Sequence, residues 1–488
     1  MVVTGLAMAS SIPVSWIMND QPVVMLELLL SSAVTIIIPL LIFFLFRNEQ
    51  KHEPIGFREA FAVVTFGWIC ASLFSAVPFM VVGKLSFVDS FFESMSGFTT
   101  TGASILNNIE ELPKGLLYWR AMTHWLGGMG IVVLSLAVLP ILGVGGMQLF
   151  KAEVPGPISD QLTPKIADSA KILWAVYVLL TGIESICLRI AGMPWFDSIC
   201  HSFATMATGG FSTKQASIEY YHNAAGFSGG VYIDTIITVF MFLAGCNFIL
   251  HLNALRGKPL NYFKDEEFKS YAKIILFTVI ASTLFLYFSD YSIAGDYKEK
   301  GLGYMLQNTS FTTVSVITTT GFCTGNFELW PHFCRLSLLA LMFVGGCGGS
   351  TGGGMKVSRI VLAYRYAKMQ IARSFYPHMV TNVQFNKNRV SSGINHRTLS
   401  FIVIFIGLFV ITAILLTILE PAIDLESAAS ASIASLGNIG PGLGKVGAWE
   451  NYAWFKDSSK MLLSFAMLAG RLEIYTVMVI FLPRFWKK

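Results

Sequence analysis

The feature that most constrains this chain is one short turn pattern that occurs four times. The copies end in glycines that follow one another at intervals of roughly 110 residues. They are Thr100, Thr101 and Gly102; Thr208, Gly209 and Gly210; Thr319, Thr320 and Gly321; and Asn438, Ile439 and Gly440. A hydroxyl side chain stands eight positions before each final glycine, namely Ser94, Ser202, Thr313 and Ser432. A fixed period of this kind predicts repeated structural units.

The composition places these turns in a membrane. Of the 488 residues, 54% are hydrophobic and 13% are charged, whereas a soluble protein carries about 25% charged residues. Apolar stretches near the roughly 20 residues that cross a bilayer recur along the whole chain. The seven cysteines are scattered without a C-x-x-C pair, so neither a disulfide framework nor a zinc site is indicated. The chain is therefore predicted to be an all-α polytopic membrane protein.

Each turn is predicted to lie between two apolar helices. The first helices are expected over residues 60–82, 171–192, 272–289 and 398–419. Re-entrant segments are expected over 89–104, 197–212, 306–322 and 424–442, and second helices over 116–142, 229–253, 333–344 and 461–483. The resulting organisation is an N-terminal two-helix extension (1–58) and four pore units (59–150, 151–260, 261–395 and 396–488).

Basic residues orient this arrangement. Lysines and arginines gather in the segments 47–58, 151–171, 256–273, 356–397 and 484–488, which all fall on one side. By the positive-inside rule that side is cytoplasmic, so the net charge of +5 needs no nucleic acid to explain it. All four turns then open from the outside, and four parallel units can surround one axis.

The chemistry of the turns suits a monovalent cation. Asp89 and Asp197 are expected to cap the starts of half-helices whose partly negative C-terminal ends face the ion. Glycine lets the backbone point its carbonyl oxygens inward, and these oxygens replace the water around a cation. A single Thr-Gly pair is most simply a loop turn, but four in register between membrane helices predict an ion filter.

Several longer motifs resemble the Trk/Ktr/HKT potassium transporter superfamily, and within it the TrkH/TrkG membrane subunits. They lie at Ser96–Ala103, Trp125–Gly130, Ala152–Pro157, Gly209–Thr213, Gly345–Lys356 and Gly470–Ile474. The resemblance implies potassium uptake through a filter at the four glycines, with potassium as the transported ion and no bound organic cofactor. It also implies a homodimer in the bacterial inner membrane. A cytosolic TrkA-like ring that binds NAD or ATP is implied as regulator, docking on the basic stretch 356–397.

A run of seven glycines interrupts the second helix of the third unit. They are Gly345, Gly346, Gly348, Gly349, Gly352, Gly353 and Gly354. One interpretation is close helix packing; the other is an irregular segment, which a membrane tolerates where it is buried or lines a wet cavity. The family resemblance implies a movable barrier here. A phosphate-binding P-loop does not fit, because Met355 separates the glycines from Lys356 and no Ser or Thr follows.

Arg471 lies in the last apolar segment. An arginine in a membrane faces the bundle interior or a cavity. One interpretation is a buried ion pair, with Glu473 or a neighbouring helix. The family resemblance implies a cationic constriction in the ion path, which forms a gate together with the glycine run.

Alternatives follow from the same residues. The residues after the four glycines differ (Ala103, Phe211, Phe322 and Pro441), so we expect potassium and rubidium as substrates with some sodium leakage.

A symporter coupled to protons or sodium is the main alternative, although no Asp/Glu/His relay across the membrane is visible. An intramembrane serine hydrolase is a remote one: Ser228 and Ser350 fit G-x-S-x-G, which needs a strand–turn–helix context. We expect a transporter rather than an enzyme.

Overall fold

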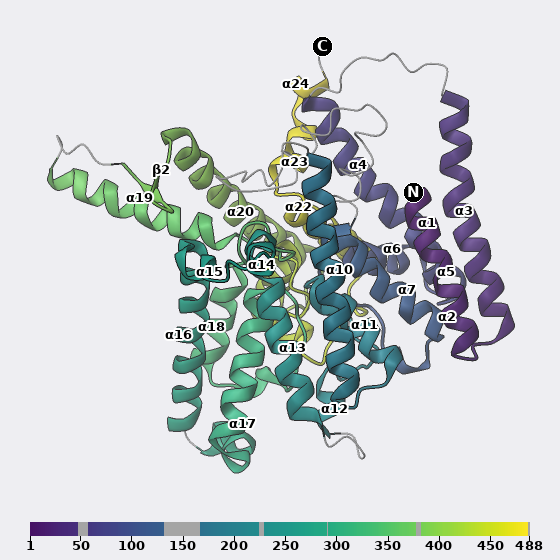
Figure 1. Ribbon diagram of the computed structural model, residues 1–488, viewed down its shortest axis with the longest axis horizontal. Coiled ribbons are helices and arrows are strands. Elements are labelled where there is room, and N and C mark those ends of the chain that lie inside the picture. Colours follow the sequence, from purple (N-terminus) through teal and green to yellow (C-terminus); the bar gives the residue numbers. More distant parts are fainter. Residues whose placement is uncertain (47–56, 131–165, 224–228, 290, 377–381, 487–488) are drawn as a thin grey trace.

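The computed structural model describes residues 1–46, 57–130, 166–223, 229–289, 291–376 and 382–486. The motif Ala152–Pro157, residue Ser228, and the basic residues in 47–56, 151–165 and 487–488 lie outside these ranges. Figure 1 shows a bundle of helices with the C-terminal end and α19 towards one end and α12 at the other.

The N-terminal extension is helical, and the first of its two expected helices is divided at Ser10. It consists of α1 (Val2–Ala9), α2 (Ser11–Ile17) and α3 (Pro22–Phe46). The carboxylate of Asp20, between α2 and α3, accepts the backbone N–H groups of Lys114 (3.0 Å) and Gly115 (2.8 Å). Because these N–H groups begin helix α7, the extension caps α7 and fixes its own position on the first unit.

Each unit contains a long first helix, a second helix that ends at a turn, and a returning helix. The first has α4 (Phe57–Ser75), α5 (Val77–Val81), α6 (Phe87–Phe98), η2 (Ile109–Glu111), α7 (Lys114–Trp125) and η3 (Leu126–Gly130). The second has α10 (Ile166–Ile190), α11 (Trp195–Met206), α12 (Glu219–Asn223), α13 (Gly230–Ala244), α14 (Phe248–Leu255) and α15 (Asn261–Lys264).

The third and fourth units follow the same order. The third has α16 (Glu266–Phe288), α17 (Tyr291–Ile317), η4 (Phe327–Leu329), α18 (His332–Met342), α19 (Val357–Phe375) and the antiparallel hairpin β1 (Gln384–Phe385) and β2 (Asn388–Arg389). The fourth has α20 (Ser392–Leu419), α21 (Leu425–Leu436), η5 (Gly444–Val446), α22 (Asp457–Arg471), α23 (Tyr475–Met478), η6 (Val479–Phe481) and α24 (Pro483–Trp486).

Two of the expected continuous second helices are broken. Among the described residues, five helices are long and apolar enough to span a membrane, or seven if two bent pairs each count as one. The bent pairs are α13 with α14 (103°) and α22 with the segment Tyr475–Phe481 (114°). Asn247 causes the first break by capping α14, and Glu473 and Ile474 (φ 62° and 50°) cause the second. Positive φ cannot continue a right-handed helix.

Three details of the half-helices also differ from expectation. Helix α17 is a single helix of 27 residues that begins at Tyr291, well before residue 306. Asp89 and Asp197 are not the N-caps of α6 and α11, because they lie within the first turn of these helices. Ser86 caps α6 by accepting the N–H of Asp89 at 3.1 Å, and Pro194 precedes α11. Ser followed by an acid three residues later is a capping box, and proline suits a helix start.

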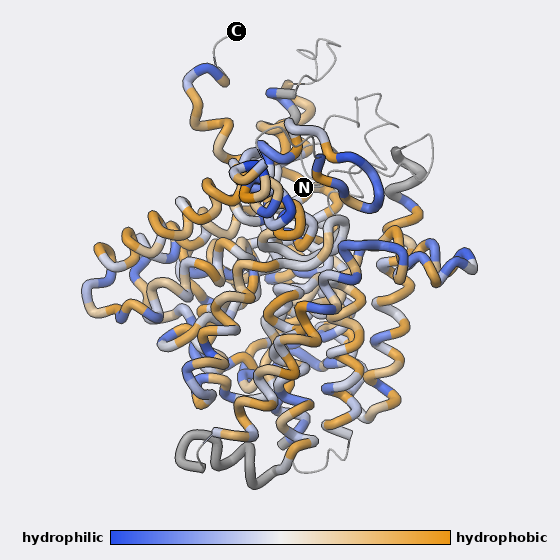
Figure 2. Tube along the Cα trace, turned by 90° about the vertical axis from the view of Figure 1, so that its left-hand side faces the viewer, coloured by the Kyte–Doolittle hydropathy of each residue, from blue (hydrophilic) through white to orange (hydrophobic). Residues whose placement is uncertain are grey.

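The half-helices occupy the centre of the molecule. Every residue of α6 from Ser90 to Phe98 is buried. The long helices instead expose apolar side chains such as Ile190 (80%) and Val403 (70%). Figure 2 shows the same division, with hydrophobic residues along the outer helices and paler segments gathered in the middle. The outer helices therefore face lipid and hold the polar half-helices away from it.

Candidate functional site

The four half-helices end in the same backbone turn. In each, the residue two positions before the final glycine has a left-handed φ: Thr100 (50°), Thr208 (54°), Thr319 (59°) and Asn438 (56°). In the first, Thr100 N–H donates to the Gly97 carbonyl (3.0 Å) and Thr101 N–H to that of Ser96 (2.9 Å). The same pair of bonds recurs in the other three turns. This is the Schellman arrangement, which satisfies carbonyls that the helix leaves free.

Threonine in this conformation is strained. A β-branched residue with positive φ is rare, and each such residue costs on the order of 1–3 kcal/mol. Three of the four turns place a fully buried threonine there. The final glycines are left-handed as well, with φ of 82°, 79°, 81° and 96° for Gly102, Gly210, Gly321 and Gly440. Such strain persists where the surrounding structure fixes it, and it clusters at functional sites.

The four turns form a closed ring. A methyl group added to each final glycine would overlap a carbonyl oxygen of the next unit. Gly102 faces Gly209 O, Gly210 faces Thr320 O, Gly321 faces Ile439 O, and Gly440 faces Thr101 O. The order runs from the first unit to the fourth and back to the first. Glycine is thus required at each of these positions for two reasons: its positive φ and the close approach of a neighbouring carbonyl.

Side chains on the ring differ among the units. The hydroxyls of Thr99 and Thr101 lie 2.8 Å apart, as do those of Thr318 and Thr320. In the fourth unit, Asn438 Nδ2 instead donates to Thr101 Oγ1 (3.0 Å) and to the Met467 carbonyl (2.9 Å). The backbone of the ring is therefore fourfold, whereas its side-chain hydrogen bonding is not.

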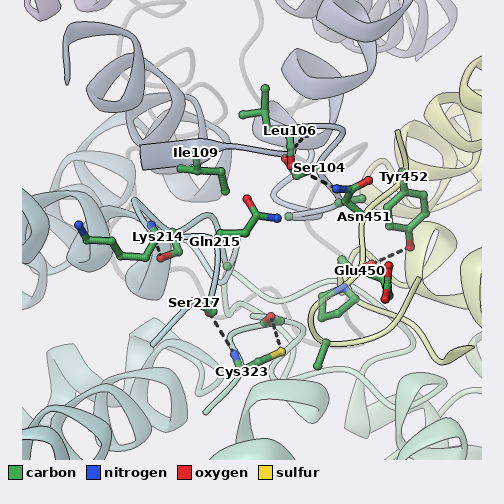
Figure 3. Close-up of a pocket in the computed structure, with 18 of the residues that line it drawn as sticks. Ser104, Leu106, Ile109, Lys214, Gln215, Ser217, Cys323, Glu450, Asn451 and Tyr452 are labelled. Atoms are coloured by element: carbon green, nitrogen blue, oxygen red, sulfur yellow. Dashed lines mark hydrogen bonds between the residues drawn. The ribbon is translucent and has the colours of Figure 1, made fainter. Parts of the chain in front are cut away.

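A cavity of about 80 Å³, here called the outer cavity, adjoins the ring. Its lining includes all four final glycines and residues of the loops that follow them. Figure 3 shows Gln215 reaching towards its middle, with Asn451 and Tyr452 on the opposite wall. Tyr452 donates its hydroxyl to the Gly440 carbonyl (2.7 Å), and burial raises the pKa of this phenol. Because the phenol stays protonated, Tyr452 remains a donor to the ring's outer edge.

Three of the four hydroxyls that stand eight positions before the glycines bond to helix carbonyls away from the ring. Ser94 Oγ donates to the Ser72 carbonyl of α4 (2.7 Å), and Ser432 Oγ donates to the Phe409 carbonyl of α20 (2.8 Å). Ser202 bonds within its own helix, to the Ser198 carbonyl. In the first and fourth units, this position fastens the half-helix to the preceding long helix.

The glycine loop, residues 343–356 between α18 and α19, lies against the opposite side of the ring. It is not helical, as the irregular-segment interpretation predicts. Gly353 N–H donates to Thr319 Oγ1 (2.7 Å), so the loop contacts a ring residue directly. Thr351 Oγ1 donates to the Met206 carbonyl at the end of α11 (3.0 Å). A methyl group on Gly353 would meet the Gly437 carbonyl at the end of α21. The loop therefore contacts the second, third and fourth turns or the helix ends that lead into them.

Glu267 holds both sides of this loop. Its Oε1 accepts the N–H groups of Gly348 (2.8 Å) and Ser358 (2.9 Å), which lie on either side of the central glycines. Lys356 Nζ donates to the Gly352 carbonyl. The sequence alone does not single out Glu267, because acidic residues are common in the first turn of any helix, where the helix dipole favours them.

Arg471 connects three parts of the chain. Its Nη1 donates to the Thr351 carbonyl of the glycine loop (2.7 Å). Its Nη2 donates to the carbonyls of Gly127 (2.7 Å) and Gly128 (3.0 Å) in the first unit. Glu473 forms its ion pair with Arg359 of α19. The break at residues 473–474 directs the Glu473 carboxylate to α19.

The start of α16 is fastened to the β-hairpin. Asn386 Oδ1 accepts the N–H of Glu266 (2.8 Å), and its Nδ2 donates to Asp265 Oδ2 (2.9 Å). Arg365 of α19 pairs with Glu266 Oε2 (2.8 Å). Since Glu267 is the next residue, three consecutive acidic residues connect the hairpin to the glycine loop.

The serine-hydrolase motif that the structure describes has a different context. Ser350 donates its hydroxyl to the Cys347 carbonyl (2.6 Å) and accepts the N–H of Gly352 (3.3 Å). It lies in the glycine loop between two helices, not on a strand–turn–helix. Its hydroxyl therefore stabilises the loop's own turn.

The chain resembles known proteins along most of its length. A family model described as "TrkH: Cation transport protein" matches residues 28–488. The chain is 40% identical over 446 residues to the "Trk system potassium uptake protein TrkH" of Salmonella typhimurium, covering 90% of this chain and 88% of that one. It is 32% identical over 435 residues to the "Trk system potassium uptake protein TrkG" of Escherichia coli, covering 88% and 86%.

A solved structure is similar over the whole fold. The crystal structure of the potassium transporter TrkH from Vibrio parahaemolyticus matches with a TM-score of 0.86 and 33% sequence identity. The match covers 100% of this chain and 97% of that one.

Proposed function

The chain belongs to the TrkH family of cation transport proteins, and from this premise we propose that it takes up potassium through the ring of four turns. The observation that carries the proposal is the ring's closure, in which each final glycine packs against a carbonyl oxygen of the next unit. Carbonyl oxygens arranged around one axis replace the hydration shell of a monovalent cation. The proposed filter residues are the twelve of the four turn copies.

The ring's chemistry supports a cation. The C-terminal ends of four half-helices point at one place, and each end carries a partial negative charge of about half an elementary charge. The buried position of the ring keeps water from screening this field. The unequal side chains of Asn438 and the threonines support selectivity for potassium that is good but not strict.

We place the gate at the glycine loop and Arg471. Arg471 brings a fixed positive charge next to Thr351 of the loop, where a cation leaving the ring would pass. Glycine costs about 1 kcal/mol per position inside a helix, so the seven glycines disfavour a regular helix and allow a second arrangement. The proposed gate residues are thus the seven glycines and Arg471. The barrier would combine the loop backbone, the charge of Arg471 beside Thr351 and the contact of Gly353 with Thr319.

A cytosolic regulator fits the basic side of the molecule. The relatives' names refer to a Trk system, and we infer a TrkA-like ring that binds NAD or ATP. The basic side includes Lys368 and Arg373 on α19 and Arg389 on the hairpin. Asn386 of the same hairpin contacts the start of α16. The same inference includes a homodimer in the bacterial inner membrane, built from the four units bounded at residues 59, 151, 261 and 396.

Ion flux into proteoliposomes tests the filter. We expect Gly102→Ser and Gly210→Ser to lower the preference for potassium over sodium, because each side chain would displace a carbonyl of the ring. Gly407→Ser is the matched control, since Gly407 lies in α20 with nothing near its missing side chain. An unchanged preference in both ring variants would remove the filter assignment. A reversal potential that shifts with pH would instead favour symport with protons.

A further inference from the structure

The junction between the first and second units contains a buried ion pair. Arg120 Nε of α7 lies 2.7 Å from Glu93 Oε1 of α6, and the two side chains are 3% and 0% exposed. Among the residues that the structure describes, no other ion pair has both side chains below 5% exposure. Burying an ion pair costs desolvation free energy unless further hydrogen bonds satisfy its atoms. The other groups that Glu93 and Arg120 contact therefore indicate which parts of the chain the pair holds.

Glu93 holds the segment after the first turn. Its Oε2 accepts the N–H of Ile105 (3.0 Å), and its Oε1 accepts the Ser104 hydroxyl (3.0 Å). Ser104 and Ile105 directly follow Gly102 and Ala103. The carboxylate therefore fixes the path of the chain as it leaves the ring.

Arg120 holds the corresponding segment after the second turn. Its Nη1 donates to the Ser212 carbonyl (2.8 Å), and its guanidinium carbon lies 3.6 Å from the centre of the Phe211 ring. Phe211 directly follows Gly210. One ion pair thus connects the exits of two adjacent turns, by hydrogen bonds and by a cation–π contact.

His124, one helical turn after Arg120, contacts the same segment. Its imidazole stacks on Phe211 with centroids 3.9 Å apart and an angle of 14°, and its Nδ1 accepts the Phe211 N–H (3.4 Å). A methyl group on Gly209 would overlap this imidazole. Because the stacked imidazole fills one face of Phe211, the guanidinium lies over the other.

The equivalent positions of the fourth unit are apolar. Gly127 and Gly470 correspond, because each packs against the carbonyl four residues before a final glycine, that of Phe98 and that of Leu436. Counting back from them aligns Arg120 with Leu463 and His124 with Met467, both fully buried. The fourth unit therefore forms its turn without the charged arrangement, which is not a requirement of the repeated fold.

We propose that Glu93, Arg120 and His124 are positioning residues that fix the spacing of the first and second turns and so set ion selectivity. The proposal deepens the proposed function and rests on the ring being the filter. Glu93 also acts on the approaching ion. Arg120 lines the outer cavity, and the Glu93 carboxylate neutralises a charge that would repel an arriving cation.

The test measures potassium and sodium uptake into proteoliposomes for three variants. Arg120→Gln should lower the potassium/sodium preference about tenfold, the size expected from losing a hydrogen bond to a charged group. Arg120→Lys keeps the charge but not the bond to Ser212 or the flat contact with Phe211, so the preference should fall while KM for potassium stays near its original value. Glu93→Gln leaves Arg120 uncompensated and should raise KM as well.

Asp89→Asn with Lys460→Gln is the matched control. These side chains form an ion pair (2.6 Å) at the start of the same helix α6, so a merely structural role for α6 would affect this variant equally. The preference should stay unchanged in the control. Suppose that Arg120→Lys and the control both keep the potassium/sodium preference of the original protein, while Gly102→Ser lowers it. This result would overturn the positioning role and leave the filter assignment intact. An unchanged preference in Gly102→Ser too would overturn both.

Discussion

The ring of turns and the glycine loop are both rich in glycine and touch each other, yet they are held in different ways. The ring's turns are fixed locally, by N–H groups that bond carbonyls three and five residues earlier in the same half-helix. The loop is fixed from a distance, by Glu267, which is 81 and 91 residues away from the groups it accepts, and by Arg471, 120 residues from Thr351.

This difference separates a rigid part from a switchable one. A Schellman turn within a buried half-helix cannot move without unfolding the helix end. A loop held by a carboxylate and a guanidinium changes its position when those contacts are exchanged for others, at a cost of a few hydrogen bonds. The ring is thus suited to choosing the ion, and the loop to controlling its passage.

The largest expected effect comes from a methyl group on the ring. Gly321→Ala forces a side chain into a left-handed conformation that costs roughly 1–2 kcal/mol and against the Ile439 carbonyl. We expect the potassium/sodium preference to be lost, measured as competing fluxes in proteoliposomes. Gly393→Ala in α20, which has open space around it, should keep its preference.

A smaller effect is expected at the loop. Arg471→Ala removes the positive charge and three hydrogen bonds to backbone carbonyls. Potassium flux without any regulator should rise about tenfold, the change that 1.4 kcal/mol produces, with selectivity preserved. Deleting residues 348–352 should act in the same direction. Lower flux in both variants, with the protein still folded, would make these elements supports and place the gate elsewhere.

Glu267→Gln should have an intermediate effect on the same step. Glutamine keeps an oxygen for one loop N–H but removes the charge that strengthens both bonds. We expect unregulated flux to rise several-fold, less than in Arg471→Ala. Glu266→Gln is the neighbouring control, because Glu266 contacts Arg365 and not the loop. Equal flux in the two variants would show that Glu267 does not restrain the loop.

The smallest effect is expected at the hairpin. Asn386→Ala removes two hydrogen bonds to the start of α16, each worth about 1 kcal/mol. Basal flux should change little, whereas the response to a cytosolic regulator should weaken. A full response, measured as the ratio of flux with and without cytosolic extract, would argue against transmission through this hairpin.

The same contrast explains what the sequence reveals. The four turns were predictable because their signal is local: a helix, then a threonine or asparagine two positions before a glycine, repeated at one period. The contacts of Glu267 and Arg471 were not, because they join segments far apart in the chain. The breaks at Asn247 and Ile474 were also missed. The sequence around Ile474 contains no signal for a positive φ. Tertiary packing imposes this conformation on a residue that normally avoids it.

The most direct test of the central claim compares two variants in one assay, potassium and sodium fluxes into proteoliposomes that contain the chain alone. We expect Gly102→Ser to alter the potassium/sodium preference without opening the pathway. Arg471→Ala should open the pathway without altering the preference. A changed preference in Arg471→Ala, or an unchanged one in Gly102→Ser, would contradict the division between a ring that selects and a loop that gates.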